Sequence, residues 1–134
     1  MTLDRAVSGP LLRQRHSAEL VREEFEKAGR PFPEIVIDDA LAEMPAERLA
    51  KRFMPQLCAD DAECLALVQE YMAAQDKKDK ERLFQKPFEK MMLKWATKEY
   101  HDDEIETFEY FVNRVKDSFS AITSNNRNGQ RVAA

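Results

Sequence analysis

Apolar residues recur at spacings of three and four along most of the chain, which is the period of an amphipathic helix. The clearest case runs from Asp103 to Ile122, where Asp103 and Glu106 have the form of a capping box. The apolar positions of this segment form one stripe, which Phe111 broadens: Ile105, Phe108, Val112, Val115, Phe119 and Ile122. The spacing predicts a regular helix whose stripe is a bundle seam, inside one chain or across a homodimer.

A second amphipathic helix is predicted near the N-terminus. Pro10 could open it, but Ser17 is the stronger start signal because its hydroxyl suits an N-cap. The apolar positions Val21, Phe25 and Ala28 share one face. Gly29 predicts a left-handed cap at the end of this helix, and the prolines that follow forbid its continuation.

The triplet Ile35-Val36-Ile37 has the composition of a short strand. No second segment stands out as its partner, and a strand without a partner leaves its backbone groups unsatisfied. We therefore interpret the triplet as an extended lead-in to a helix that Asp38 caps and that reaches Met44.

Three further helical segments follow. Pro45 opens one, with Pro55 closing or kinking it, and Asp60 caps the next, which runs to about Lys77. The charged run 76–82 is either a helix surface or a turn. The apolar positions of these segments predict buried faces: Leu49, Phe53, Leu57, Cys64, Leu65, Leu67, Val68, Tyr71, Met72, Phe84, Phe88, Met91, Met92 and Trp95.

Taken together, the pattern predicts an all-α fold, a compact bundle of about five helices. Residues 10–122 are expected to form a single helical domain. Residues 1–9 are expected to be an irregular N-terminus. Residues 123–134 are polar and lack an apolar period, which predicts a disordered C-terminal tail.

Composition excludes some classes of function but does not identify one. The 134 residues carry a net charge of −4, which argues against DNA binding over the whole surface. A local basic strip remains, because Lys86, Lys90, Lys94 and Lys98 recur every four residues. Such a strip could meet a nucleic-acid backbone, although the solvated face of an amphipathic helix is the favoured interpretation.

Material for catalysis is sparse. The chain has three glycines, two histidines and two cysteines, so it offers no glycine-rich phosphate loop and no zinc set. Cys58 and Cys64 are expected to be free thiols, and His16 a solvated surface residue. The acidic run 99–104 could hold a metal, but helix capping accounts for Asp102 and Asp103. We expect neither an enzyme nor a bound cofactor or metal.

Location is an expectation from absent signals. No apolar run approaches the roughly 20 residues that span a bilayer. The first residues contain Asp4 and Arg5 and no apolar signal core. We expect a cytoplasmic protein.

Residues 18–57 resemble the theta subunit of bacterial DNA polymerase III. The resemblance lies in Val21, Phe25 and Ala28-Gly29, an aromatic at Phe32, Val36-Ile37, Ala40-Leu41, and then Glu47, Leu49, Phe53-Met54 and Leu57. It implies a small helical accessory protein that binds and stabilises the proofreading exonuclease subunit of a replicative polymerase. The partner-binding residues to test first would be Phe32, Val36 and Ile37; Phe32 lies in a loop between two prolines.

The sequence thus predicts a non-enzymatic protein–protein interaction module, with a theta-like accessory subunit as its most specific version. Two alternatives stay open. One is a plasmid- or phage-encoded regulator or inhibitor of another host protein. The other is nucleic-acid binding through the lysine strip, which would weaken steeply as salt rises.

Overall fold

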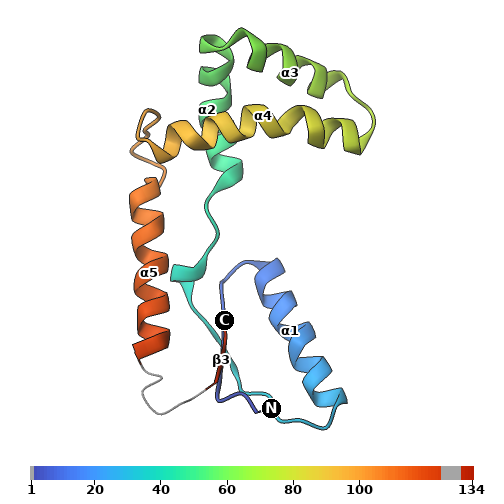
Figure 1. Cartoon of the computed structure of the whole chain (residues 1–134), viewed down its shortest axis with the longest axis vertical. Coiled ribbons are helices and arrows are strands. Elements are labelled where there is room, and N and C mark those ends of the chain that lie inside the picture. Colours follow the sequence, from blue (N-terminus) through green and yellow to red (C-terminus); the bar gives the residue numbers. More distant parts are fainter. Residues whose placement is uncertain (1, 125–130) are drawn as a thin grey trace. The chain divides into compact units, whose positions relative to one another are not determined.

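The computed structural model describes residues 2–124 and 131–134. Its contacts divide the chain into two compact units (Figure 1). Unit 1 comprises Met1–Met44 and Phe111–Ala134, and unit 2 comprises Pro45–Tyr110. The fold is mostly helical, as predicted, with five α-helices and one small sheet in the described part of the chain. The prediction of a single domain over residues 10–122 stays a prediction.

Unit 2 contains three helices, α2 (Ala46–Asp60), α3 (Ala62–Ala73) and α4 (Lys77–Ala96). Their apolar stripes meet in one core, but the predicted buried face of α3 is wrong at Leu65 and Met72, which are 40% and 74% exposed. The side chains that are nearly or fully buried there are Leu49, Phe53, Leu57, Cys64, Leu83, Met91, Trp95, Tyr100 and Ile105.

The helix boundaries in unit 2 follow side-chain caps. The Asp61 carboxylate accepts from the Cys64 N–H at 3.0 Å, so α3 is capped one residue later than predicted. Asp76 caps α4, and the charged run is therefore the first two turns of a helix rather than a turn. Pro55 lies inside α2 rather than closing it. Both cysteines are free thiols, as predicted.

In unit 1, two segments that were predicted to be irregular or merely extended, within residues 1–9 and at 35–37, are strands. Residues Arg5–Ser8 form strand β1, and Ile35–Ile37 form strand β2, which pairs with β1 in parallel. The partner strand that the sequence did not reveal lies in the segment predicted to be irregular. With strand β3 (Val132–Ala133) on its other side, β1 is the middle strand of a sheet ordered β2–β1–β3.

Helix α1 (Leu12–Lys27) begins earlier than predicted. The Ser17 hydroxyl donates to the Arg13 carbonyl at 2.9 Å, so Ser17 is inside the helix and is not its cap. Gly29 has a φ of 67°, which confirms the predicted left-handed cap. No residue of α1 is buried, although its stripe has the pattern of a core face.

The last helix, α5, spans Phe108–Ser124 rather than starting at Asp103. The Thr107 hydroxyl accepts from the Tyr110 N–H at 3.1 Å and acts as the cap. The predicted capping box is wrong because residues 102–106 are held as a turn within unit 2: Arg52 pairs with Asp102, and the Trp95 indole donates to the Glu106 carbonyl at 3.0 Å.

The predicted disordered tail is wrong at both of its ends. Thr123 and Ser124 continue α5, and Val132–Ala133 pair with β1 as β3. The Arg131 N–H also donates to the Asp4 carboxylate at 2.8 Å, which ties the C-terminal residues to the first strand. The central part of that prediction, residues 125–130, lies outside the described residues.

Candidate functional site

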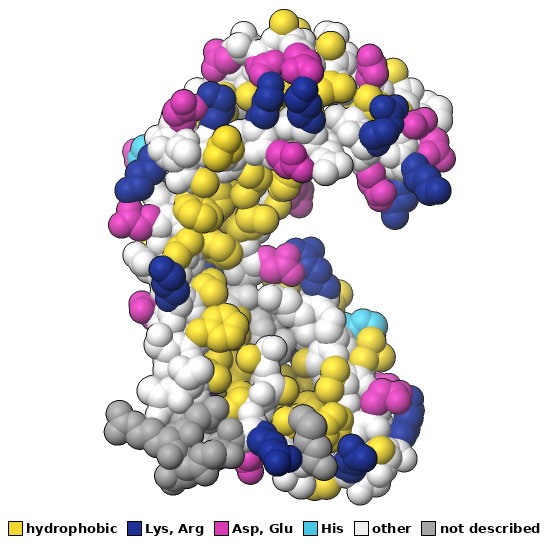
Figure 2. Space-filling view, in the orientation of Figure 1, with side chains coloured by type: hydrophobic (Ala, Val, Ile, Leu, Met, Phe, Trp, Pro, Cys, Tyr) yellow, Lys and Arg dark blue, Asp and Glu magenta, His cyan; other side chains and the backbone are white. Residues whose placement is uncertain are grey.

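The candidate site is an apolar groove in unit 1, which we call the α1–α5 groove. It has a volume of about 550 Å³, within the range of about 300–1,000 Å³ that is usual for ligand pockets. Its lining comes from β1, α1, the loop around Phe32, the segment 41–43, α5, and the end of β3 with the residue that follows it. Figure 2 shows hydrophobic side chains gathered on the viewed face of this unit.

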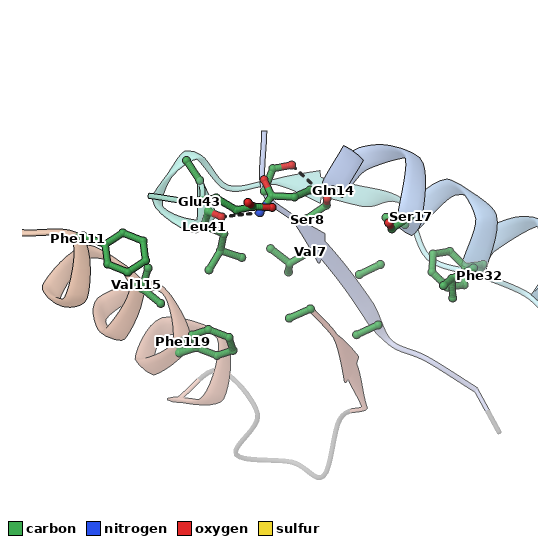
Figure 3. A pocket seen from close by; sticks show the side chains of 17 residues that line it. Val7, Ser8, Gln14, Ser17, Phe32, Leu41, Glu43, Phe111, Val115 and Phe119 are labelled. Carbon is green, nitrogen blue, oxygen red and sulfur yellow. Dashed lines mark hydrogen bonds between the residues drawn. The ribbon is translucent and has the colours of Figure 1, made fainter. Parts of the chain in front are cut away.

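Helix α5 supplies one wall of the groove. Phe111, Val115 and Phe119 are spaced by four residues, so they lie one above another on a single face. Figure 3 shows these three side chains pointing toward the strand that carries Val7. The wall is only partly covered, because Phe119 is 49% exposed.

Helix α1 supplies the other wall through Gln14, Ser17, Ala18 and Val21. These positions follow the same helical face, and Val21 is 44% exposed. Ala6, Val7 and Ser8 of β1 form the buried floor between the walls. The groove therefore has two helical walls over a buried strand.

Hydrogen bonds fix the rim of the groove. The Gln14 side chain accepts from the Leu11 N–H at 3.2 Å and donates to the Leu41 carbonyl at 2.8 Å. It lies where a Cβ at Gly9 would be, so any larger residue at this position would displace the Gln14 amide. Arg13 forms an ion pair with Glu43, whose carboxyl pKa is held below its usual range by that hydrogen bond. Figure 3 shows Gln14 beside Leu41 at this rim.

Hydrogen bonds also anchor the α5 wall. The Arg114 guanidinium donates to the carbonyls of Ala40 and Ala42, both at 2.7 Å, and lies over the Phe111 ring at 4.9 Å. The Ser118 hydroxyl donates to the Asp38 carboxylate at 2.5 Å. Because Asp38 also accepts from the Ala40 N–H, it connects α5 to the short helix η1 (Asp39–Leu41). Asp38 caps this helix as predicted, but the helix ends at Leu41 and does not reach Met44.

The predicted partner-binding residues fall in two places. Phe32 lines the α1–α5 groove and packs edge-on against Phe25, with ring centroids 5.3 Å apart. Val36 and Ile37 lie outside the groove, on β2, where they are 53% and 43% exposed. Their role as a partner-binding site stays a prediction.

The lysine strip is neutralised by carboxylates of unit 2. Lys86 and Lys90 pair with Glu63 and Asp61 at 2.5 and 2.7 Å. Lys94 pairs with Glu99 and Lys98 with Glu109, both at 2.5 Å. Hydrogen bonding to Asp61 raises the pKa of Lys90, and hydrogen bonding to Lys86 lowers the pKa of Glu63. Each positive charge thus has a matching negative charge, which favours the interpretation of the strip as a solvated helix face.

No group of histidine, cysteine and acidic side chains is arranged to hold a metal ion in the parts of the chain that the structure describes. In the acidic run 99–104, Asp102 accepts from the Glu104 N–H at 2.9 Å and Asp103 contacts His101. Within the same described residues, none of the helices combines the length and the apolar character that crossing a membrane requires.

Sequence reasoning missed most of the groove. Phe111, Val115 and Phe119 were predicted as parts of a buried seam, and Val21 as part of a core face. One signal pointed elsewhere: the α1 face also carries the polar Gln14 and Ser17, which suits a half-open surface better than a core.

In the comparisons with known proteins, no family model, curated protein or solved structure matches the chain.

Proposed function

We propose that the protein is a non-enzymatic protein-binding module, and that the α1–α5 groove receives an amphipathic helix of its partner. The observation that supports this is the pair of half-exposed helical faces lining one apolar groove. Most soluble proteins bury such faces against their own chain, and a contiguous exposed apolar surface usually marks an interaction site.

The dimensions of the groove suit a helix. From Phe111 to Phe119 the α5 wall covers nine residues, a rise of about 12 Å at 1.5 Å per residue. A partner helix with apolar side chains at positions i, i+4 and i+7 covers about the same length, and helices commonly dock in grooves through such anchors. An extended peptide would place only alternate side chains into the groove and would leave its backbone groups unpaired against apolar walls.

The most specific version of this proposal is a theta-like accessory subunit that binds a proofreading exonuclease. Its support is the resemblance of residues 18–57, within which Val21 and Phe32 line the groove. The same segment extends into unit 2, since Leu49, Phe53 and Leu57 belong to the core of that unit.

Phe119 gives the sharpest test of the groove. About half of an aromatic side chain of roughly 200 Å² is roughly 100 Å², worth about 2 kcal/mol when a partner covers it. We expect Phe119→Ala to weaken binding about thirtyfold. Met72→Ala is the matched control, because Met72 is 74% exposed on α3 of unit 2 and should leave affinity unchanged.

Two measurements test the general proposal of a helix-binding module and its theta-like version separately. Calorimetric titration with the exonuclease subunit should show a complex that Phe119→Ala weakens, and no complex at micromolar concentrations would remove the theta-like version. To test the helix-binding module in general, a photo-crosslinker is placed at Val21 and should capture an amphipathic helical segment of the partner. A synthetic peptide of that segment should then bind the protein with the same dependence on Phe119. Equal capture from Val21 and Met72 would contradict the groove as the binding site.

A further inference from the structure

Strand β2 is an edge of the sheet. In the order β2–β1–β3, β1 is paired on both sides and β2 on one side only. The Asp38 N–H donates to the Ser8 carbonyl of β1 at 2.9 Å. Backbone groups in a parallel strand alternate between its two sides. The backbone N–H and carbonyl groups of Val36, and the N–H of Asp38, therefore point toward β1, whereas those of Ile35 and Ile37 point outward. None of the described residues pairs with these outward groups.

This edge strand is only three residues long, which limits strand addition, but it lacks the other features that usually prevent it. Natural edge strands carry a lysine, a proline, a bulge or an inward charge. The strand itself consists of three β-branched residues, Ile35, Val36 and Ile37, and the last two are about half exposed. Such residues favour an extended conformation and pack well against a neighbouring strand.

The charges around the edge of β2 indicate which kind of segment can bind there. From Glu34 to Glu43 the chain holds four carboxylates and no basic residue. Asp38 and Glu43 are engaged within the unit, whereas Glu34 and Asp39 are exposed and make no ion pair with any described residue. In the strand register the nearest basic residue is Arg5. It lies on β1, on the side of β2 away from the open edge.

A second copy of the chain fits this edge poorly. Antiparallel pairing of two β2 strands about Val36 would place Glu34 opposite Asp38 of the other copy, and like charges directly opposite destabilise a strand pair. A parallel pairing of the same edges cannot close into a symmetric dimer. An extended segment with basic residues on both sides of an apolar centre meets the carboxylates with opposite charge.

We propose that the outer edge of β2 binds an extended peptide segment of another protein, apolar at its centre and flanked by lysine or arginine, as a fourth strand. The backbone groups of Ile35 and Ile37 supply the pairing, and Glu34 and Asp39 select the flanking charges. This site goes beyond the proposed function, because it uses a different surface and a different partner conformation from the α1–α5 groove.

The test uses a capped seven-residue probe peptide with alternating valine and threonine between two arginines. Titration of the full chain, followed by NMR, should shift the amide signals of Ile35 and Ile37 and slow their hydrogen exchange. A peptide with glutamates in place of the arginines should bind at least about tenfold more weakly at low salt. A peptide N-methylated at every backbone amide should not bind, since neither of its edges can then donate a hydrogen bond to the strand.

Variants of the protein test the same edge. Ile37→Pro removes an outward N–H and should abolish binding of the arginine peptide, whereas Ile37→Val keeps both the strand and the binding. Should Ile37→Pro fail to fold by circular dichroism, the N-methylated peptide still decides the result. Phe119→Ala should leave peptide binding unchanged, which separates this site from the groove. Binding of the N-methylated peptide as tight as that of its parent, or an Ile37 amide already protected without peptide, would overturn the proposal.

Discussion

Lys98 provides a test of how backbone conformation contributes to stability. It follows the end of α4 with a φ of 64°, the one positive value among the described non-glycine residues. This conformation lets the Lys98 N–H donate to the Trp95 carbonyl at 3.1 Å, while the Tyr100 N–H donates to the Lys94 carbonyl at 3.1 Å. Helices commonly place glycine at such a position, because a Cβ there crowds the backbone.

The expected effect follows from three contributions. The left-handed conformation costs a non-glycine residue about 1–2 kcal/mol, and glycine loses about 0.5–1 kcal/mol more conformational entropy on folding. The ion pair between Lys98 and Glu109 is exposed on both sides and contributes about 0–1 kcal/mol. Lys98→Ala removes the ion pair but keeps the strain. We therefore expect Lys98→Gly to exceed Lys98→Ala in free energy of unfolding by about 1 kcal/mol.

Urea unfolding at neutral pH measures this difference directly. The midpoint should rise from the alanine to the glycine variant at an unchanged slope, and the melting temperature should rise by about 4 °C. A glycine variant no more stable than the alanine variant would show that the strain at Lys98 is relieved in another way, and the reasoning would fail.

Three further predictions concern packing and charge. Arg114→Met should lower the free energy of unfolding by about 3 kcal/mol, because two carbonyls lose a charged donor, with Arg114→Lys less damaging in urea unfolding. Leu57→Ala should cost about 2–5 kcal/mol by the same assay, since Leu57 is fully buried, and a smaller loss would show that the core closes around the cavity. Hydrogen bonds, first from Lys90 and then from the Cys64 N–H, lower the pKa of Asp61 to about 2. Because this folded-state pKa lies below the unfolded value of about 3.9, its contribution is present above about pH 4 and lost as pH falls toward 2. Asp61→Asn should therefore make the melting temperature depend less on pH between about pH 5 and pH 2. The same dependence on pH in the variant and the unmodified protein would contradict this role.

Sequence periodicity predicted the main core residues of the helices of unit 2, although it wrongly included Leu65 and Met72 of α3 in a buried face. Their stripes of Leu49, Phe53, Leu57, Met91 and Trp95 were predicted as core faces and are buried. Helix formation depends on residues three or four positions apart, so a short window of sequence contains the necessary information. For the same reason Gly29 was correctly identified as a left-handed cap.

The sheet could not be predicted in this way. The triplet at 35–37 carried a strand signal, but its partner at 5–8 reads Arg-Ala-Val-Ser and has none. Pairing across about thirty residues is decided by the fold rather than by local preference, because a strand gains its hydrogen bonds only from a distant segment. The prediction therefore rejected a strand that exists.

The candidate site shows the same division. Periodicity alone determined that α1 and the residues 108–122 form amphipathic helices with apolar faces, because that depends on neighbours along the chain. Only the tertiary structure decided that Val21 and Phe119 line an open groove instead of a closed core, because burial depends on what lies opposite a face. The start of α5 at Phe108 was decided in the same way, since the Trp95 indole and Arg52 hold the preceding residues in a turn.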